Sequence, residues 1–336
     1  MENLEVKTAS GFWEGRSVFV TGGTGLVGSW LVKKLLAARA QIVLLVKDTN
    51  PQSEISRSGD IDKVAITYGS LEDFGALESA INLHDVDTVF HLGAQTQTKV
   101  AHRYPLGTFE SNIRGTYNLL EACRIHASLV QRVIIASTDK AYGTQKNLPY
   151  TETTQLDARH SYDVSKSCAD LLAQAYVHTY RLPVGITRFG NVYGGGDWNL
   201  NRIVPGTIIN LARSKPPVIR SDGTPLRDYI YVEDVAEGYL RLAEKLDDPA
   251  VTGQAFNFSN EKPVSVREIV TSIRKLMGRE DLEPLIQNVA TAEIAQQFLD
   301  ATKAKKLLGW QPRFTLEEGL KKTIDWYLAF LASRDS

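Results

Sequence analysis

The chain has 336 residues, of which 43% are hydrophobic and 23% charged, and its formal net charge at pH 7 is −1. This composition is typical of a globular protein with room for one large domain or two, and the near-zero charge gives no reason to expect nucleic acid or an anionic membrane as a partner. No apolar run approaches the ~20 residues that span a bilayer, and the first residues lack the layout of a signal peptide, so we expect a cytoplasmic protein.

A strand, a glycine-rich turn and a helix form the first predicted unit. Residues 17–21 are mostly β-branched or apolar, residues 22–28 read Gly-Gly-Thr-Gly-Leu-Val-Gly, and apolar residues then recur at helical spacing. In this arrangement backbone N–H groups and a helix N-terminus receive a pyrophosphate. Gly22 would permit the tight turn, Gly25 the close approach of a phosphate, and Gly28 the packing of helix on strand. The unit therefore predicts nucleotide binding.

Short β-branched runs alternate with periodic helical segments through the first half of the chain. We expect strands at residues 41–46, 64–68, 86–92, 132–136 and 183–187, and helices at 73–81, 107–126 and 162–180. Such alternation predicts an α/β fold with a doubly wound parallel sheet and helices on both faces.

The end of the second strand bears on the choice between NAD and NADP. An acidic residue there would bind the ribose 2′-hydroxyl and favour NAD. Val46 holds the approximate position, and Lys47 and Asp48 come directly after it. Asp48 could be a displaced ribose ligand, whereas Lys47 could meet a 2′-phosphate, so the residues leave both cofactors open.

Two polar groups of residues lie in the middle of the chain. Tyr162 and Lys166 lie four residues apart on a predicted helix, so they can share a face. A phenol is a poor base at its reference pKa near 10, and an ammonium beside it favours the phenolate. Upstream, residues 137–140 read Ser-Thr-Asp-Lys. A lone Y-x-x-x-K spacing occurs by chance in many helices, and the nucleotide-binding unit gives it meaning here.

The regular alternation of strand-like and helix-like segments ends after residue 187. Residues 191–198 are rich in glycine and several prolines come after them, as in loops that carry binding residues over a rigid sheet. We expect helices at 233–244, 265–277 and 315–330, and a strand at 254–258 that returns to the main sheet. Residues 1–187 with about 233–258 would form a cofactor-binding domain, and about 188–232 with 259–336 a smaller, sequence-interleaved substrate domain.

The chain resembles the extended short-chain dehydrogenase/reductase family, the nucleotide-sugar epimerases and dehydratases. The resemblance runs nearly end to end, through residues 21–28, 91–94, 112–116, the Tyr162/Lys166 pair, and residues 188–194, 227–234 and 308–312. It implies a Rossmann-type domain that holds NAD, with NADP as the alternative. The implied cofactor contacts are Gly22, Gly25, Leu26, Val27, Gly28, Lys47, Asp48, Leu92, Ala94, Tyr162 and Lys166.

The resemblance also implies the first chemical step. Tyr162 would remove a proton from the sugar 4-hydroxyl while hydride passes from C4 to the nicotinamide. Lys166 would hold the ribose and lower the pKa of Tyr162, and Thr138 would hydrogen-bond the reacting oxygen. The product of this step is a 4-keto sugar.

Asp139 and Lys140, beside Thr138, bear on the fate of this 4-keto sugar. A 4-epimerase has only to turn the ketone over and return the hydride, whereas a 4,6-dehydratase must also take a proton from C5 and protonate the departing C6 oxygen. Asp139 is suited to be that acid if burial raises its pKa, and Lys140 to be the base if desolvation lowers its own. We therefore expect a 4,6-dehydratase, with a 4-epimerase as the alternative and a non-catalytic regulatory protein as a third reading.

The Asp-Lys pair is similar to that of the CDP-glucose 4,6-dehydratases and of the inverting UDP-N-acetylglucosamine dehydratases. Residues 28–31, 94–95 and 190–198 resemble the first group, as do Arg202 and residues 204–205. Residues 22–25 read Gly-Gly-Thr-Gly, whereas those enzymes usually have Gly-His-Thr-Gly.

Substrate binding and assembly complete the predictions. A nucleoside diphosphate carries about two negative charges, and the fork of arginine suits phosphate. With the resemblance, the predicted substrate-binding residues are Gln95, Asn191, Arg202, Val204 and Arg227. The resemblance implies a homodimer packed through the helices near 107–126 and 162–180. Neither the six histidines nor the two cysteines show metal-ligand spacing, so we expect no metal.

Overall fold

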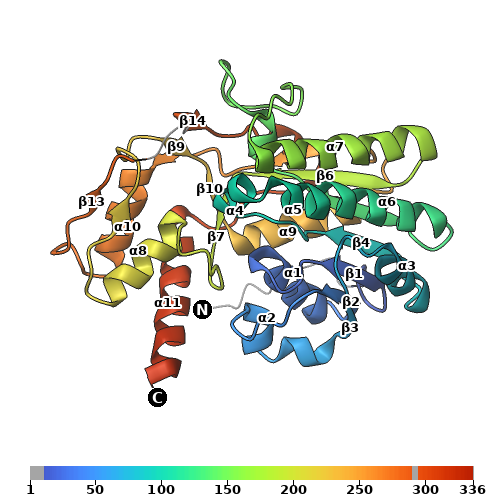
Figure 1. Ribbon diagram of the computed structural model, residues 1–336, viewed down its shortest axis with the longest axis horizontal. Coiled ribbons are helices and arrows are strands. Elements are labelled where there is room, and N and C mark those ends of the chain that lie inside the picture. Colours follow the sequence, from blue (N-terminus) through green and yellow to red (C-terminus); the bar gives the residue numbers. More distant parts are fainter. Residues whose placement is uncertain (1–10, 290–293, 336) are drawn as a thin grey trace.

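Seven parallel strands form the central sheet of the protein (Figure 1). The structure is a computed structural model that describes residues 11–289 and 294–335. The strands have the order β3-β2-β1-β4-β5-β6-β11, which contains the doubly wound order 3-2-1-4-5-6. The predicted α/β Rossmann-type fold is therefore confirmed. The strands are β1 (Ser17–Thr21), β2 (Gln41–Val46), β3 (Ala65–Tyr68), β4 (Thr88–His91), β5 (Arg132–Ala136), β6 (Val184–Phe189) and β11 (Ala255–Phe258).

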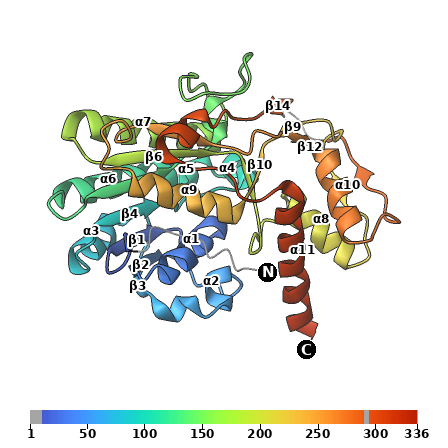
Figure 2. The ribbon, with the colours of Figure 1, turned by 180° about the vertical axis from the view of Figure 1, so that it is seen from behind.

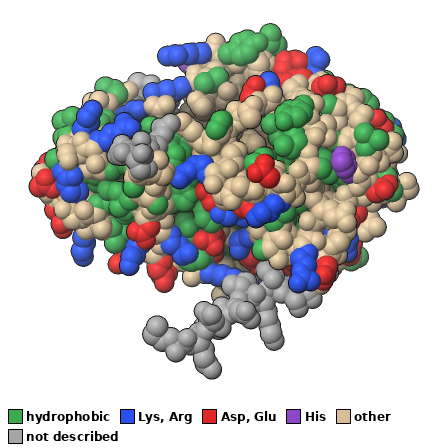
Figure 3. All heavy atoms as spheres, turned by 90° about the horizontal axis from the view of Figure 1, so that it is seen from below, with side chains coloured by type: hydrophobic (Ala, Val, Ile, Leu, Met, Phe, Trp, Pro, Cys, Tyr) green, Lys and Arg blue, Asp and Glu red, His purple; other side chains and the backbone are tan. Residues whose placement is uncertain are grey.

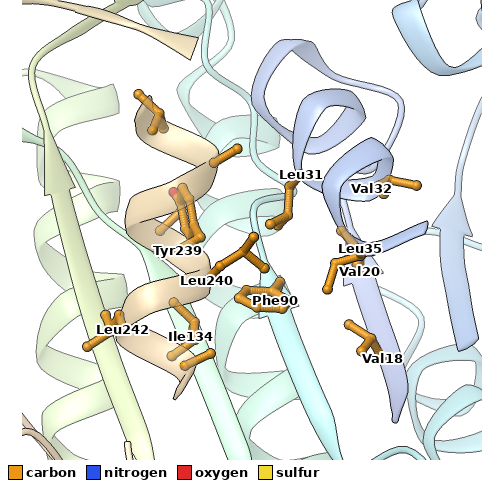
Figure 4. Packing of buried hydrophobic residues seen from close by; sticks show 14 of the residues in the cluster. Val18, Val20, Leu31, Val32, Leu35, Phe90, Ile134, Tyr239, Leu240 and Leu242 are labelled. Atoms are coloured by element: carbon orange, nitrogen blue, oxygen red, sulfur yellow. The ribbon is translucent and has the colours of Figure 1, made fainter. Parts of the chain in front are cut away.

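Helices cover both faces of this sheet. α1 and α9 pack on one face, and α3, α6 and α7 on the other (Figures 1 and 2). Leu31 and Leu35 of α1 meet Tyr239 and Leu240 of α9 around Phe90 of β4 (Figure 4). Burying each such side chain contributes about 1.5–3 kcal/mol. The helices are α1 (Leu26–Ala37), α2 (Glu54–Arg57), α3 (Phe74–Leu83), α4 (Thr98–Arg103), α5 (Pro105–Phe109), α6 (Gly115–Ile125), α7 (Ser161–Tyr180) and α9 (Val232–Glu244).

The helix predicted at residues 107–126 is interrupted. α5 runs into a π-helical turn, Glu110–Arg114, and α6 starts directly after it. Single π turns are frequent at functional sites. This one carries Asn112, which is buried beneath the loop after β4.

A second, smaller group of elements begins after the carboxyl end of β6 (Figure 1). Its strands form three small sheets, β10-β7, β12-β9-β14 and β13-β8. β11 then returns to pair with β6, as predicted. The elements are β7 (Asn191–Tyr193), α8 (Ile203–Ala212), β8 (Val218–Ile219), β9 (Leu226–Arg227), β10 (Tyr229–Tyr231), β12 (Val264–Ser265), α10 (Val266–Leu276), β13 (Leu285–Ile286), β14 (Gln296–Gln297) and α11 (Leu316–Asp335). The division into two domains near residues 187, 232 and 258 stays a prediction.

The surface and the cysteines agree with an ordinary globular protein. Acidic and basic side chains are interspersed on the face shown in Figure 3. Within residues 11–289 and 294–335, no helix is both long and apolar enough to cross a membrane. Cys123 and Cys168 are both free thiols. The expectation about a signal peptide concerns N-terminal residues that lie outside the described ranges.

Candidate active site

The glycine turn between β1 and α1 leaves a helix N-terminus open. Gly22 has a φ of +75°, and a Cβ there would lie 2.7 Å from the backbone nitrogen of Gly93. A Cβ on Gly28 would lie 2.1 Å from the Gly22 carbonyl oxygen, so α1 can approach the turn only with glycine at this position. The N-cap residue Gly25 has no side chain to cap the helix, and the first turn of α1 carries no acidic residue. These backbone N–H groups therefore fit a dinucleotide pyrophosphate.

The segment after β4 forms a second wall of this region. Leu92, Ala94 and Gln95 are partly exposed there. The Gln95 backbone N–H donates to Asn112 Oδ1 (2.7 Å), and Asn112 Nδ2 donates to the Gln95 carbonyl oxygen (3.0 Å) and to Ser165 Oγ on α7 (2.9 Å). Asn112 thus ties the loop to the helix that carries Tyr162. The sequence marked this asparagine only as part of a family motif, and its buried position on the π turn could not be read there.

Lys47 and Asp48 lie just past the end of β2, where a ribose ligand was predicted, and both are exposed. β2 is separated from β5, which leads to Thr138, by β1 and β4. These two residues therefore belong to a different part of the sheet edge from the predicted catalytic residues. Their role toward the cofactor stays a prediction.

Tyr162 and Lys166 lie near the start of α7, but the electrostatics differ from the expectation. Burial raises the pKa of Tyr162 to about 12, and the charge of Arg202 opposes this rise. The Lys166 amine instead donates to the carbonyl oxygen of Ala136 at the end of β5, and burial lowers the pKa of Lys166 to about 8. The predicted lowering of the Tyr162 pKa by Lys166 is therefore not found in the protein as it stands.

Thr138, Asp139 and Lys140 come together at a 3₁₀ turn, Asp139–Tyr142, directly after β5. Thr138 Oγ1 donates to Asp139 Oδ1 (3.0 Å) and accepts from the Lys140 backbone N–H (3.3 Å). Asp139 is 1% exposed, and its Oδ2 has no hydrogen-bond partner among the described residues. Burial raises the pKa of Asp139, although the charges of Lys140 and Arg227 oppose the rise. This carboxyl meets the condition that the sequence set for an acid.

Two residues that sequence reasoning did not single out complete this turn. Gln297 Oε1 accepts from Lys140 Nζ (3.3 Å), and Gln297 Nε2 donates to the Asp139 carbonyl oxygen (3.2 Å). Asp228, between β9 and β10, is 1% exposed, and burial raises its pKa to about 7. Asp228 could have been found from the sequence, because it lies in the family motif at residues 227–234. Gln297 lies in no motif, so no sequence signal marks it.

The predicted substrate-binding residues occupy the second group of elements. Arg202 is the N-cap of α8, is exposed, and donates to Asp197 Oδ2 (3.1 Å). Asn191 starts β7 and is partly exposed, whereas Arg227 on β9 is largely buried. Val204 is 2% exposed in the core around α8, so its side chain offers no free surface to a ligand.

The electrostatic couplings show which of these residues act on one another. Arg202 lowers and Asp139 raises the pKa of Tyr162, and Arg227 lowers that of Asp139. The phenol, the buried acid and two arginines of the second group thus converge on one site. Within the described residues, no group of three or more His, Cys, Asp or Glu side chains could hold a metal ion.

His91 lies beneath this site rather than in it. It ends β4, and its ring contacts Thr21 Oγ1 (2.8 Å) and Thr116 Oγ1 (3.1 Å). Burial, and then the charge of Lys166, lower the pKa of His91 to about 3. The neutral ring thus ties β4 to β1 and to α6 by hydrogen bonds at both nitrogens, and at neutral pH it carries no extra proton to give to a substrate.

Comparisons with known proteins give the chain relatives along most of its length. Residues 19–323 match the family model described as GDP-mannose 4,6 dehydratase. The chain is 31% identical to a CDP-glucose 4,6-dehydratase of Salmonella typhimurium, over 96% of this chain and 94% of that protein.

Two solved structures have the same fold. One is a UDP-glucose 4-epimerase of Thermotoga maritima with UDP-glucose, with a TM-score of 0.85, 27% identity, and 94% of this chain and 99% of that one covered. The other is a dTDP-glucose 4,6-dehydratase of Bacillus anthracis in complex with NAD, with a TM-score of 0.83, 26% identity, and 94% and 97% covered. Sequence and structure therefore lead to the same class of proteins.

Proposed function

Because the chain belongs to the GDP-mannose 4,6-dehydratase family, we propose that it is an NAD-dependent nucleotide-sugar 4,6-dehydratase, which converts an NDP-hexose to an NDP-4-keto-6-deoxyhexose. The family match bears out the resemblance that the motifs carried. One observation carries the choice of reaction: Asp139 is a buried carboxyl of raised pKa with an unpartnered oxygen, beside Thr138 and Lys140. CDP-glucose is the first substrate to test, since a relative along nearly the whole chain is named for it.

The chain's own residues divide between cofactor and substrate. The open N-terminus of α1 at Gly25 would hold the pyrophosphate of NAD, and the exposed Asp48 would meet its ribose. NAD, when bound, supplies a hydride acceptor for C4 and a hydride donor for C6. Arg202 and Arg227 would bind the diphosphate of the substrate, with Asn191 and Gln95 at the sugar.

Each proton in the reaction has a named carrier. Burial holds the pKa of Tyr162 at about 12, so Tyr162 must be ionised before this step. As the phenolate it takes the proton of the 4-hydroxyl, and Thr138 hydrogen-bonds the reacting oxygen. Lys140 takes the C5 proton, and the C5–H electron pair forms the C5–C6 double bond as the C6–O bond breaks. Asp139 protonates the departing oxygen, which leaves as water. Lys140 then returns its proton to C5, and the hydride that bound NAD would supply completes C6 as a methyl group. The sugar thus loses one water, and the chain's residues balance apart from one proton to be moved from Tyr162 to Asp139.

A 4-epimerase is the second candidate, because the similar structure from Thermotoga maritima is named as one. An epimerase would use Tyr162 and Thr138 in the same way. It would leave the buried acid Asp139 without a proton-transfer role, and for that reason we rank it second.

We further propose a cytoplasmic homodimer. Leu106, Leu171 and Tyr180 are 61%, 55% and 53% exposed on α5 and α7. These helices contact one another and lie in the region implied by the resemblance, so they would provide an apolar face for a second copy. The two free cysteines suit a reducing compartment. Sedimentation equilibrium of wild type and of Leu171→Glu would test the dimer, since a charge in that face should yield monomers.

Incubation of the protein and NAD with CDP-glucose, UDP-glucose, UDP-N-acetylglucosamine and dTDP-glucose tests the function. We expect one of these to give a product lighter by one water, with a 4-keto group and a C6 methyl. A product of unchanged mass with inverted C4 would instead assign the epimerase. Tyr162→Phe is the control, and it should form neither product.

A further inference from the structure

A buried glutamine joins the turn after β5 to the second, smaller group of elements. Gln297 lies on β14 and is 1% exposed. Its Nε2 donates to the Asp139 carbonyl oxygen (3.2 Å), and its Oε1 accepts from Lys140 Nζ (3.3 Å). A lysine ammonium only donates and a carbonyl oxygen only accepts, so these two partners fix the orientation of the amide. One side chain therefore holds the backbone of the proposed acid and the amine of the proposed base.

The Lys140 amine has a neutral partner rather than a charged one. Within residues 11–289 and 294–335, it makes one hydrogen bond, to Gln297, and no ion pair with a carboxylate. The charge of Lys140 lowers the pKa of Asp139 and of Asp163, although neither carboxyl forms an ion pair with it. An amide oxygen accepts from an amine in either protonation state, whereas a carboxylate in its place would favour the ammonium. Gln297 thus orients the amine without opposing the loss of its proton.

The strand that carries Gln297 also lies beside a proposed substrate ligand. β14 pairs with β9 in parallel, and Gln297 is opposite Arg227 in this register. Gln296, the other residue of β14, is exposed, as expected for side chains that alternate along a strand. β14 therefore connects the arginine proposed for the diphosphate with the lysine proposed for the C5 proton.

The backbone around Gln297 is anchored without the help of its side chain. On one side, the Leu226 N–H donates to the Ala295 carbonyl oxygen (2.9 Å). On the other, the Tyr150 N–H donates to the Phe298 carbonyl oxygen (3.0 Å), and the Asp300 N–H donates to the Tyr150 carbonyl oxygen (2.9 Å). Since the main chain already holds β14 in place, the amide is free to serve the turn that carries the acid and the base.

We propose that Gln297 is a positioning residue for the elimination step: it holds the Lys140 amine through a neutral acceptor, at a fixed place beside Asp139, so that the amine can take the C5 proton. This inference rests on the proposed dehydratase function. In that step the C5–H bond breaks, an N–H bond forms on unprotonated Lys140, and the electron pair forms the C5–C6 double bond as Asp139 protonates the departing oxygen. Gln297 itself exchanges no proton.

Single-turnover measurements on the protein loaded with NAD separate the steps, with the nucleotide sugar that wild type converts. Reduced nicotinamide forms when C4 is oxidised, and it disappears when hydride returns to C6 after the elimination. In Gln297→Met we expect formation at the wild-type rate, an unchanged Kd for the sugar, and disappearance slower by about 10–100-fold, because a charge-assisted hydrogen bond to the base is lost. Equal rates of disappearance would overturn the proposal. A slowing of both phases, or a weakened Kd, would show a merely structural role and would also overturn it.

Gln296→Met is the matched control, since it makes the same change on the exposed side of the same strand. Both phases should run at the wild-type rates in this variant, and a slowed disappearance would overturn the proposal. If Gln297→Met does not fold, Gln297→Asn keeps an amide at the buried position but shortens its side chain by one methylene, so that it cannot reach both partners. We expect the same slow disappearance, and a wild-type rate would overturn the proposal.

A double-mutant cycle shows whether Gln297 acts through Lys140. On the residual elimination of Lys140→Met, the added change Gln297→Met should slow disappearance by less than about twofold, because the two effects are not independent. A further loss as large as that in the wild-type background would overturn the proposal. A wild-type product that keeps its water would overturn the dehydratase function together with this role. A dehydrated wild-type product with unchanged kinetics in Gln297→Met would overturn the role of Gln297 alone.

Discussion

Two buried polar clusters meet at the 3₁₀ turn Asp139–Tyr142, and they are built in opposite ways. At its end lies the closed cluster, Asp170, Arg188, Tyr142 and Asn257. Arg188 binds both oxygens of Asp170 (2.8 and 2.9 Å) and donates to the Tyr142 hydroxyl (2.8 Å), which donates to Asn257 Oδ1 (2.7 Å). Asn257 Nδ2 also donates to the Tyr150 carbonyl oxygen (2.9 Å), and Asp170 Oδ1 accepts from Gln174 (2.8 Å), so the polar atoms of this cluster have partners within it or directly beside it.

At the start of the same turn lies the open cluster, Thr138, Asp139, Lys140 and Asp228. It is as deeply buried at its two acids, but one oxygen of each acid has no partner among the described residues. Most buried polar atoms in proteins have a hydrogen-bond partner. The closed cluster follows this rule, whereas the open cluster directly beside it does not. The closed cluster therefore holds the turn in place, and the open cluster contains the residues to which the proposed reaction assigns proton transfer.

The largest expected effect is on catalysis at the edge of the open cluster. Tyr162→Phe removes the only proposed base for the 4-hydroxyl, so turnover should fall by at least about 10²–10⁴-fold, while thermal unfolding stays near wild type. The matched control is Tyr180→Phe, a tyrosine on the same helix that is 53% exposed, which should keep full activity. Equal losses in the two variants would reject Tyr162 as the base.

The closed cluster should respond in stability instead. Asp170→Asn leaves the Arg188 guanidinium buried without its counter-charge, which costs about 3–5 kcal/mol in the free energy of unfolding. Denaturant unfolding measures this loss, and the product made by the folded fraction should be unchanged. Asp157→Asn, which breaks the exposed pair with Arg159, should cost less than about 1 kcal/mol. A change of product in Asp170→Asn would contradict the assignment of a purely structural role to the closed cluster.

The pH dependence of stability separates the clusters further. The pKa of Asp228 rises on folding from 3.8 to about 7, so folding favours its protonated form. This contribution to stability is complete below about pH 3.8 and is lost as pH rises through about 7. Between pH 5 and 8, wild type should therefore lose at least about 1 kcal/mol relative to Asp228→Asn, since one pKa unit corresponds to about 1.4 kcal/mol. Parallel stability curves for the two proteins would contradict this.

The smallest effect is expected away from both clusters, where α2 meets α11. The Arg57 guanidinium lies 4.8 Å from the ring centre of Trp326 and 4.3 Å from that of Phe330. Arg57→Ala should cost about 0.5–1 kcal/mol per contact in unfolding experiments and leave kcat unchanged. Arg57→Lys should recover part of that loss. A change in the product formed by Arg57→Ala would show that the contact between α2 and α11 belongs to the active site, contrary to this expectation.

Much of the fold could be predicted from the sequence because its signals are local. The glycines at 22, 25 and 28 between a strand and a helix predicted the nucleotide-binding unit, and the alternation of short runs predicted the sheet. The helix at 107–126 was predicted as continuous, because a π turn that places Asn112 under a loop depends on contacts with other elements.

The site was predicted only in part, for the same reason. Tyr162, Lys166 and Thr138–Lys140 carry motifs, but Gln297 reaches Lys140 across 157 residues of sequence through a two-residue strand. The opposite pKa shifts of Tyr162 and Lys166 arise from burial, which no spacing reveals. Sequence therefore supplied the chemical groups, whereas their protonation depends on the fold.

The most direct test of the proposed elimination is Asp139→Asn with the nucleotide sugar that wild type converts. If Asp139 is the acid, C4 is still oxidised in this variant, so that the absorbance of reduced nicotinamide appears and persists while loss of water slows by about 10²–10⁴-fold. Formation of the dehydrated product at the wild-type rate would contradict the assignment of Asp139 as the acid.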